Sequence, residues 1–252
     1  MAQDTLLRRR KVDNAPSQEE PTATTQDLER RSTLPPHHTL TSLSLSHVQF
    51  VPDSILSELL AYVTLSPLAI FCGYVAVAVN DRDLKPLVML AGQVLSEALN
   101  AIMKRVIKQA RPTAYIGDGY GMPSSHSQFM TYFATYSMLL LYRRDVAMDD
   151  IIPPVVSAIV IIWSALVIYS RVHLYYHTWQ QVVAGTLCGI AFALGYYYVV
   201  YNILRPNGIF EWIVDQPLAK QFYIRDTDAI PDLAKLEWEM WQQLKNVHVE
   251  TE

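Results

Sequence analysis

The chain has 252 residues, a formal net charge of −4 and 51% hydrophobic residues, values that one soluble domain could also have. The order of the residues excludes that interpretation, because charges concentrate near both ends and in short loops, leaving apolar runs of bilayer-spanning length between them. We therefore predict an all-α polytopic membrane protein, and the mildly acidic total gives no general attraction for nucleic acid.

Residues 1–50 form a polar tail that we expect to be disordered, because its first 45 or so residues are polar and rich in Ser, Thr and Pro. The tail carries a basic run at residues 8–11, but no apolar segment follows that run. The pattern therefore does not predict a cleavable signal peptide.

A transmembrane domain is expected over residues 51–205, with about five membrane-spanning helices. The apolar runs predict helices near residues 55–79, 86–103, 126–142 and 155–169, and a fifth that follows residue 181 and ends near residue 204. Five spans place the loop after the second helix and the loop after the fourth helix on one side of the membrane. The residues of these two loops can therefore share a pocket.

The remainder, residues 206–252, contains no predicted span. Apolar residues recur there at roughly helical spacing, at Leu233, Leu236, Trp241 and Leu244. This spacing predicts an amphipathic helix on the membrane surface, although packing against the loops would explain it equally well.

The second predicted span carries a polar stripe, because Gln93, Glu97, Asn100 and Lys104 follow one another at steps of four, three and four. Ionisable groups within a span usually face a cavity or a partner. Glu97 is therefore expected either to line a site or to bond a neighbouring helix.

Residues 104–126 combine a basic segment with the start of a helix. Lys104, Arg105, Lys108 and Arg111 fall within eight residues, and the sequence Pro-Ser-Ser-His then opens the third apolar run. A helix start offers free N–H groups to an anion, and cations reinforce that attraction. We expect a phosphate site here; the alternative is a basic loop that touches lipid headgroups.

Three motifs occur in order on the two loops. They are Lys104 with Arg111-Pro112, then Pro123-Ser124-Ser125-His126, and then Ser170-Arg171 with His177. This set resembles the type 2 phosphatidic acid phosphatase superfamily, whose signatures read KXXXXXXRP, PSGH and SRXXXXXHXXXD. Two positions depart from the signatures, since Ser125 replaces a glycine and Gln181 replaces an aspartate. The runs GMPSSHSQFM, YSRVHLYYHTWQQV, LAYVTLSPLAI and IRDTDAIP are similar to the dolichyldiphosphatase branch, in which glutamine is usual at that place.

The resemblance implies a catalytic scheme without metal or other cofactor. His177 would attack the terminal phosphorus as nucleophile, and His126 would serve as general acid and base. The phosphate-binding residues would be Lys104, Arg111, Ser124, Ser125 and Arg171. Gln181 lies four residues after His177 and can share its helix face, where its carbonyl oxygen can accept the ring N–H and orient the histidine. His173 and His177 also have the spacing of metal ligands on a helix, which is the competing interpretation.

The resemblance also implies a substrate and a location. The lipid would be dolichyl diphosphate, a polyprenyl diphosphate, hydrolysed in the endoplasmic reticulum membrane with the site facing the lumen. Basic residues flanking the spans are equally numerous on the two sides, so the positive-inside rule favours that orientation only if the site itself holds Lys104, Arg111 and Arg171. The alternatives are a broad lipid phosphate phosphatase and an inactive relative that binds lipid headgroups.

Overall fold

The computed structural model describes residues 41–42, 48–50, 54–113, 119–143, 151–230 and 233–250. Most of the predicted disordered tail lies outside these residues. Within it, β1 (Thr41–Ser42) pairs antiparallel with β2 (Gln49–Phe50).

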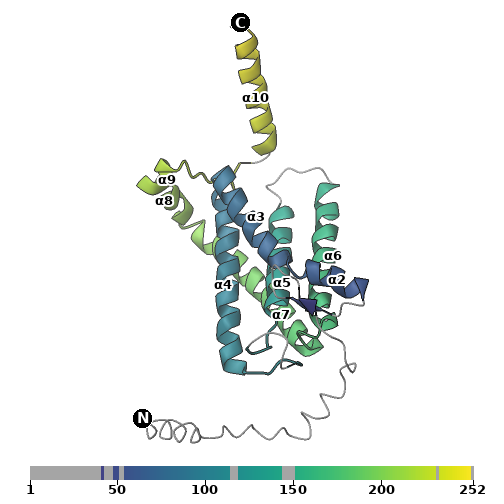
Figure 1. Cartoon of the computed structure of the whole chain (residues 1–252). Coiled ribbons are helices and arrows are strands. Elements are labelled where there is room, and N and C mark those ends of the chain that lie inside the picture. Colours follow the sequence, from purple (N-terminus) through teal and green to yellow (C-terminus); the bar gives the residue numbers. More distant parts are fainter. Residues whose placement is uncertain are drawn as a thin grey trace, which may run out of the picture. The chain divides into compact units, whose positions relative to one another are not determined.

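The rest of the described chain is helical, as predicted (Figure 1). The helices are α2 (Ile55–Val63), α3 (Ser66–Asp81), α4 (Leu84–Ile107), α5 (Ser125–Leu141), α6 (Ile152–His173), α7 (Trp179–Val199) with its π-helical extension η1 (Val200–Leu204), α8 (Ile209–Asp215), α9 (Pro217–Gln221) and α10 (Leu233–Glu250). In the described residues, four helical stretches are long and apolar enough to cross a membrane, namely Ile55–Asp81, Leu84–Ile107, Ile152–His173 and Trp179–Leu204. The third predicted span corresponds to α5, whose 17 residues are at the lower limit of spanning length.

The first predicted span is not one continuous helix, because it breaks between α2 and α3 at Thr64 and Leu65. Pro67 explains the break, since it has no N–H to donate to the Val63 carbonyl and its ring would clash with that oxygen. The Ser66 hydroxyl donates to the Val63 carbonyl instead, at 2.6 Å. The break lets α2 pack against α6 while α3 packs against α4.

Helix α5 lies between α4, α6 and α7 and is the most buried of the spans. It approaches α7 closely, because Gly185 and Gly189 carry no side chain where the two helices meet. A Cβ at Gly189 would collide with the Gln128 carbonyl and the Thr131 hydroxyl. Small residues four apart are the usual means of bringing membrane helices into such contact.

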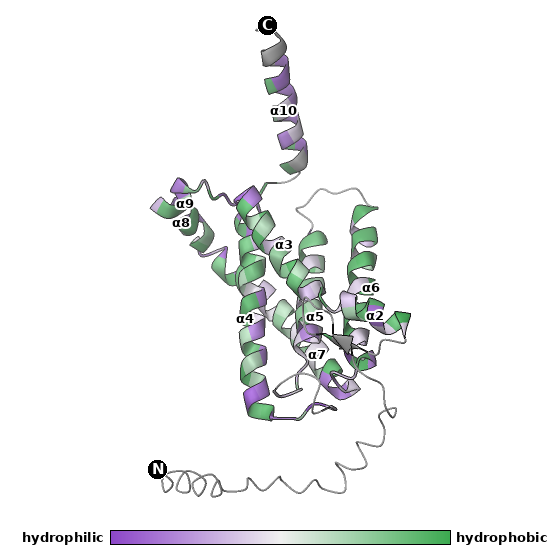
Figure 2. Ribbon diagram, viewed as in Figure 1, coloured by the Kyte–Doolittle hydropathy of each residue, from purple (hydrophilic) through white to green (hydrophobic). Residues whose placement is uncertain are grey.

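Most residues of α3, α6 and α7 are hydrophobic, as the green ribbon of these helices shows in Figure 2. Many of them are exposed, among them Val79, Ile159, Ile162 and Leu187. An apolar surface of this kind is suited to hydrocarbon and not to water.

The segment after the spans is tied to the helix ends opposite the motif loops. The Leu84 N–H donates to the Arg225 carbonyl at 3.0 Å, and the Thr227 hydroxyl donates to Asp83. Asp228 pairs with Arg143 at 2.6 Å and with Arg205 at 3.2 Å. Carboxylates thus hold Arg143 and Arg205 at this end of the bundle.

Candidate active site

Four helix ends meet at the lower end of the bundle in Figure 1, the C-terminal ends of α4 and α6 and the N-terminal ends of α5 and α7. Hydrogen bonds join the two motif loops there. The Thr113 hydroxyl donates to the Tyr175 carbonyl at 2.9 Å, and the Ser124 N–H donates to the Gln181 carbonyl at 3.0 Å. The two loops therefore share one end of the bundle.

His177 is buried directly before α7, and Gln181 holds its ring. His177 Nδ1 lies 3.2 Å from Gln181 Oε1, while Gln181 Nε2 donates to the Ala110 carbonyl at 2.8 Å. Gln181 Oε1 also accepts from the Thr178 N–H at 3.3 Å. A carbonyl oxygen only accepts and a main-chain N–H only donates, so both contacts orient the amide with its oxygen toward the ring. Nδ1 therefore carries the proton, and Nε2 keeps its lone pair.

The charge state of His177 follows from its surroundings. Burial lowers the pKa of His177 to about 3, and the nearby Arg171 and Arg111 guanidinium groups act in the same direction. The hydrogen bond to Gln181 opposes this effect only in part. At neutral pH the imidazole is uncharged, which is the state that a nucleophilic nitrogen requires.

Arg171 is 4% exposed and occupies the last turn of α6. Its Nη1 donates to the Thr64 hydroxyl at 2.5 Å, and its guanidinium lies 4.0 Å from the centre of the Tyr176 ring. The Arg171 carbonyl accepts a hydrogen bond from the His177 N–H at 3.0 Å, which holds the histidine next to the C-terminal end of α6. Thr64 lies in the break between α2 and α3, within the run LAYVTLSPLAI but outside the three phosphatase motifs, so its contact with Arg171 was not predicted.

The other two predicted cations come from the end of α4 and the loop after it, Lys104 from the last turn of the helix and Arg111 from the loop. Lys104 Nζ donates to the Ser125 hydroxyl at 2.5 Å, which joins α4 to the start of α5. Arg111 Nε donates to the Gly119 carbonyl at 3.4 Å, and the Arg111 charge acts on His177. The structure therefore brings the three predicted cations around one histidine.

The two serines of the Pro-Ser-Ser-His motif differ in their surroundings. Ser124 is fully buried, and its Oγ accepts a hydrogen bond from Ser127 at 3.0 Å. The Ser125 hydroxyl accepts from Lys104 and donates to Asn100 Oδ1 at 3.1 Å. The Ser125 proton is thus committed to Asn100, whereas among the described residues the Ser124 hydroxyl only accepts. The motif also offers an anion the main-chain N–H groups of the first turn of α5.

His126 lies on that first turn, between Ser125 and Ser127. A main-chain group of Thr64 hydrogen-bonds its ring, and the ring lies close enough to Arg171 and to His177 to interact electrostatically with both. The two predicted catalytic histidines are therefore neighbours, one at the start of α5 and one before α7.

His173 has a different environment. Its Nε2 lies 3.2 Å from the Ser57 hydroxyl and its Nδ1 lies 3.4 Å from the Tyr169 hydroxyl. Among the described residues, no group of three or more His, Cys, Asp and Glu side chains is arranged to hold a metal ion. His173 thus links α6 to α2.

Taken together, the helical membrane fold and a cluster of two histidines and three cations at its helix ends define a membrane-embedded site of the phosphatase type. The PAP2 superfamily model matches residues 85–205. Dolichyldiphosphatase 1 of Dictyostelium discoideum is 38% identical over 203 residues, 79% of this chain and 88% of the relative. Its human counterpart is 36% identical over 206 residues, 78% and 86% of the two chains. Dolichyldiphosphatase of Saccharomyces cerevisiae is 30% identical over 190 residues, 72% and 79%.

The chain belongs to the PAP2 superfamily and, within it, to the group of the dolichyldiphosphatases. No solved structure matches it.

Proposed function

We propose that the protein hydrolyses dolichyl diphosphate to dolichyl phosphate and inorganic phosphate. The observation that carries the proposal is the neutral, oriented imidazole of His177 beside Arg171 and Arg111. The names of the relatives support the choice of the lipid. We place the activity in the endoplasmic reticulum membrane with the site facing the lumen, where the product re-enters the lipid-carrier cycle of protein N-glycosylation.

The reaction proceeds in two steps. His177 Nε2 attacks the terminal phosphorus, the bond from that phosphorus to the bridging oxygen breaks, and His126 gives a proton to the departing dolichyl phosphate. Water then attacks the phosphohistidine, His126 takes up its proton, and inorganic phosphate leaves with His177 restored. Lys104, Arg111 and Arg171 offset the charge on the three non-bridging oxygens, because arginine forks and a lysine point charge both suit phosphate.

Gln181 occupies the place where the superfamily signature has aspartate. A glutamine orients the ring without adding a charge, whereas an aspartate would also stabilise the imidazolium. A diphosphate substrate tolerates this loss because its leaving group, a lipid phosphate, is far more acidic than an alcohol. Replacing Gln181→Asp should therefore shift the preference from diphosphate toward monophosphate lipids, and an unchanged ratio of the two rates would contradict this explanation.

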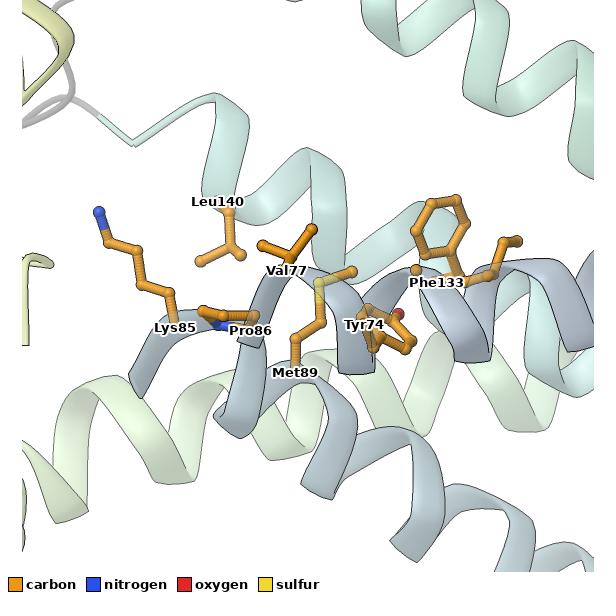
Figure 3. Close-up of a pocket in the computed structure, with 9 residues that line it drawn as sticks. Tyr74, Val77, Lys85, Pro86, Met89, Phe133 and Leu140 are labelled. Carbon is orange, nitrogen blue, oxygen red and sulfur yellow. The ribbon is translucent and has the colours of Figure 1, made fainter. Parts of the chain in front are cut away.

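The isoprenoid chain has a candidate path along the spans. A groove of about 390 Å³ opens between α3, α4 and α5, with Phe133 at one end and Lys85 and Leu140 at the other (Figure 3). Ile70 and Phe133, which line it, also pack on the apolar cluster that includes Val63, next to Thr64 at the site. The apolar lining of the groove, and the packing of Ile70, Phe133 and Val63 on one cluster, support an isoprenoid chain as the occupant of the groove.

A larger side chain at Gly73 tests whether the isoprenoid chain lies in this groove. A Cβ at Gly73 meets no atom within 4 Å, so a larger side chain would project from the groove wall without disturbing the fold. We expect Gly73→Leu to lower kcat/KM for dolichyl diphosphate several-fold and to leave a short-chain isoprenyl diphosphate unaffected. Gly195→Leu is the matched control, since Gly195 has equally open space outside the groove. Equal losses for both chain lengths would exclude the groove as the chain site.

The hydrolysis itself is tested by phosphate release from the detergent-purified protein in the presence of EDTA. Dolichyl diphosphate and phosphatidate are compared as substrates, with His177→Ala alongside. We expect turnover of the diphosphate that the substitution abolishes. Preference for phosphatidate would indicate a broad lipid phosphate phosphatase, and no turnover of either lipid would indicate an inactive relative that binds headgroups.

A further inference from the structure

A row of polar side chains, partly exposed at the site and buried further in, runs into the interface between α4 and α5. Lys104 donates to Ser125, and the Ser125 hydroxyl donates to Asn100 Oδ1. Asn100 Nδ2 donates to Gln128 Oε1 at 2.7 Å, and Gln128 Nε2 donates to the Ser96 carbonyl at 2.7 Å. Asn100 is 2% exposed and Gln128 is fully buried. Five side chains or carbonyls thus form one continuous chain of hydrogen bonds.

The direction of every bond in this chain is fixed. The Ser96 carbonyl can only accept, so Gln128 turns its NH₂ group toward Ser96 and its oxygen toward Asn100. Asn100 must then donate to Gln128, and its second contact, with the Pro123 carbonyl at 3.4 Å, imposes the same orientation. Asn100 Oδ1 is left to accept the Ser125 hydroxyl. The lone pairs of Ser125 in turn face Lys104, whose ammonium can only donate.

We infer that Asn100 is a positioning residue of the phosphate site, which holds the Lys104 ammonium in place through the hydroxyl of Ser125. The inference rests on the phosphate site of the proposed function. An ammonium on a flexible stem has many rotamers, and the oriented hydroxyl selects the one that lies against the start of α5. The serine that replaces the signature glycine is thereby given a role, since a glycine offers no hydroxyl to join Asn100 to Lys104.

The neighbouring residues of the polar stripe distinguish this role from simple adhesion between helices. Gln93 lies on the same face of α4 and is 1% exposed, yet neither polar atom of its side chain has a hydrogen-bond partner among the described residues. Glu97 Oε1 is buried without a hydrogen-bond partner there as well, so this oxygen forms no bond to a neighbouring helix among the described residues. Polarity alone therefore does not recruit a residue of the stripe into the chain.

The test is a double-mutant cycle read out as the affinity for inorganic phosphate, measured by calorimetry on the full-length protein in detergent. We expect Asn100→Val, Ser125→Ala and Lys104→Met each to weaken phosphate binding about tenfold or more, the range seen for residues that orient a ligand-binding side chain. In the Lys104→Met background, Asn100→Val should change the affinity less than about twofold, because its effect acts through the lysine.

Controls separate positioning from folding. Ser125→Ala cuts the chain at the partly exposed end and leaves the Asn100 to Gln128 bond intact, so it tests the proposal even if Asn100→Val does not fold. Gln93→Met alters an equally buried residue on the same face outside the chain and should bind phosphate like the unsubstituted protein. Three results would each overturn the inference. The first is that the losses of phosphate affinity caused by Asn100→Val and Lys104→Met multiply in the double variant. The others are full affinity in Asn100→Val or Ser125→Ala, and no phosphate binding by the unsubstituted protein.

Turnover of dolichyl diphosphate is measured on the same samples. Coupled phosphate binding without turnover would refute the proposed function and leave the positioning role standing. Turnover with independent, multiplying effects would refute the positioning role and leave the proposed function standing.

Discussion

Replacing Gln181→Leu removes the group that fixes the proton on His177 Nδ1 while keeping a side chain of similar volume. Gln181 is fully buried, and its Oε1 lies 3.2 Å from Nδ1. Without this acceptor the ring can rotate or move its proton to Nε2, and the attacking lone pair is lost. The substitution also leaves the Ala110 carbonyl and the Thr178 N–H without their side-chain partner.

The magnitude follows from the charge that develops on the ring. In the proposed reaction the imidazole becomes cationic as Nε2 bonds to phosphorus, so the lost hydrogen bond belongs to the charged class, worth about 1.5–3 kcal/mol. At about 1.4 kcal/mol for each factor of ten, kcat should fall about 10- to 150-fold. KM should change little, because His177 does not bind the ground state by charge. Two unpaired main-chain groups should also lower the free energy of unfolding by about 1–3 kcal/mol each if water cannot reach them.

The assay is steady-state phosphate release from dolichyl diphosphate, together with thermal unfolding to establish that the variant is folded. Gln109→Leu is the matched control, because Gln109 touches only the other end of the Gln181 amide, at 3.4 Å, and should leave kcat within about threefold. A folded Gln181→Leu variant with kcat within twofold of the unsubstituted protein would refute the assigned role.

Three further predictions concern pH, packing and the far end of the bundle. The pKa of His177, about 3, lies below that of an unfolded histidine, about 6.5, so the unfolded chain binds the extra proton between these values. The unfolding free energy should therefore fall as the pH drops through that window, and His177→Ala should flatten this slope; equal slopes would contradict the assigned pKa. Gly189→Ala should lower the melting temperature, because its methyl meets the Gln128 carbonyl, at a cost of about 1–3 kcal/mol, while Gly195→Ala, in open space, should not. Asp228→Asn should lower the free energy of unfolding by about 1–3 kcal/mol and leave the phosphate affinity unchanged. This cost is smaller than that of breaking a fully buried ion pair, because the Arg143 and Arg205 side chains stay 15% and 17% exposed. A changed phosphate affinity would show that this end of the bundle is coupled to the site.

Hydropathy predicted the spans because a bilayer requires long apolar segments. Their ends were harder to place, since α6 continues past the apolar run through Arg171 to His173. The break at Thr64 was missed although Pro67 signalled it, because hydropathy does not register the loss of one N–H.

Local motifs predicted the cations and both histidines of the site. Four-residue spacing predicted the contact of Gln181 with His177, but the shared helix face was wrong, because His177 lies before α7 begins. The partners of these groups depend on the register between helices, which no local pattern contains. Thr64 reaches Arg171 only because α2 packs across α6, and Gln128 meets Asn100 only where α4 and α5 touch. A glutamine within the third apolar run was the available signal for the second contact.

The central claim is that His177 becomes phosphorylated during turnover, and rapid quenching of a single turnover tests it most directly. Dolichyl diphosphate labelled on its terminal phosphate is mixed with excess protein, quenched with alkali, and the labelled peptide is sequenced. The account predicts an alkali-stable, acid-labile label on the peptide that contains His177, absent from His177→Ala. Labelling of another residue, or full turnover by His177→Ala, would contradict it.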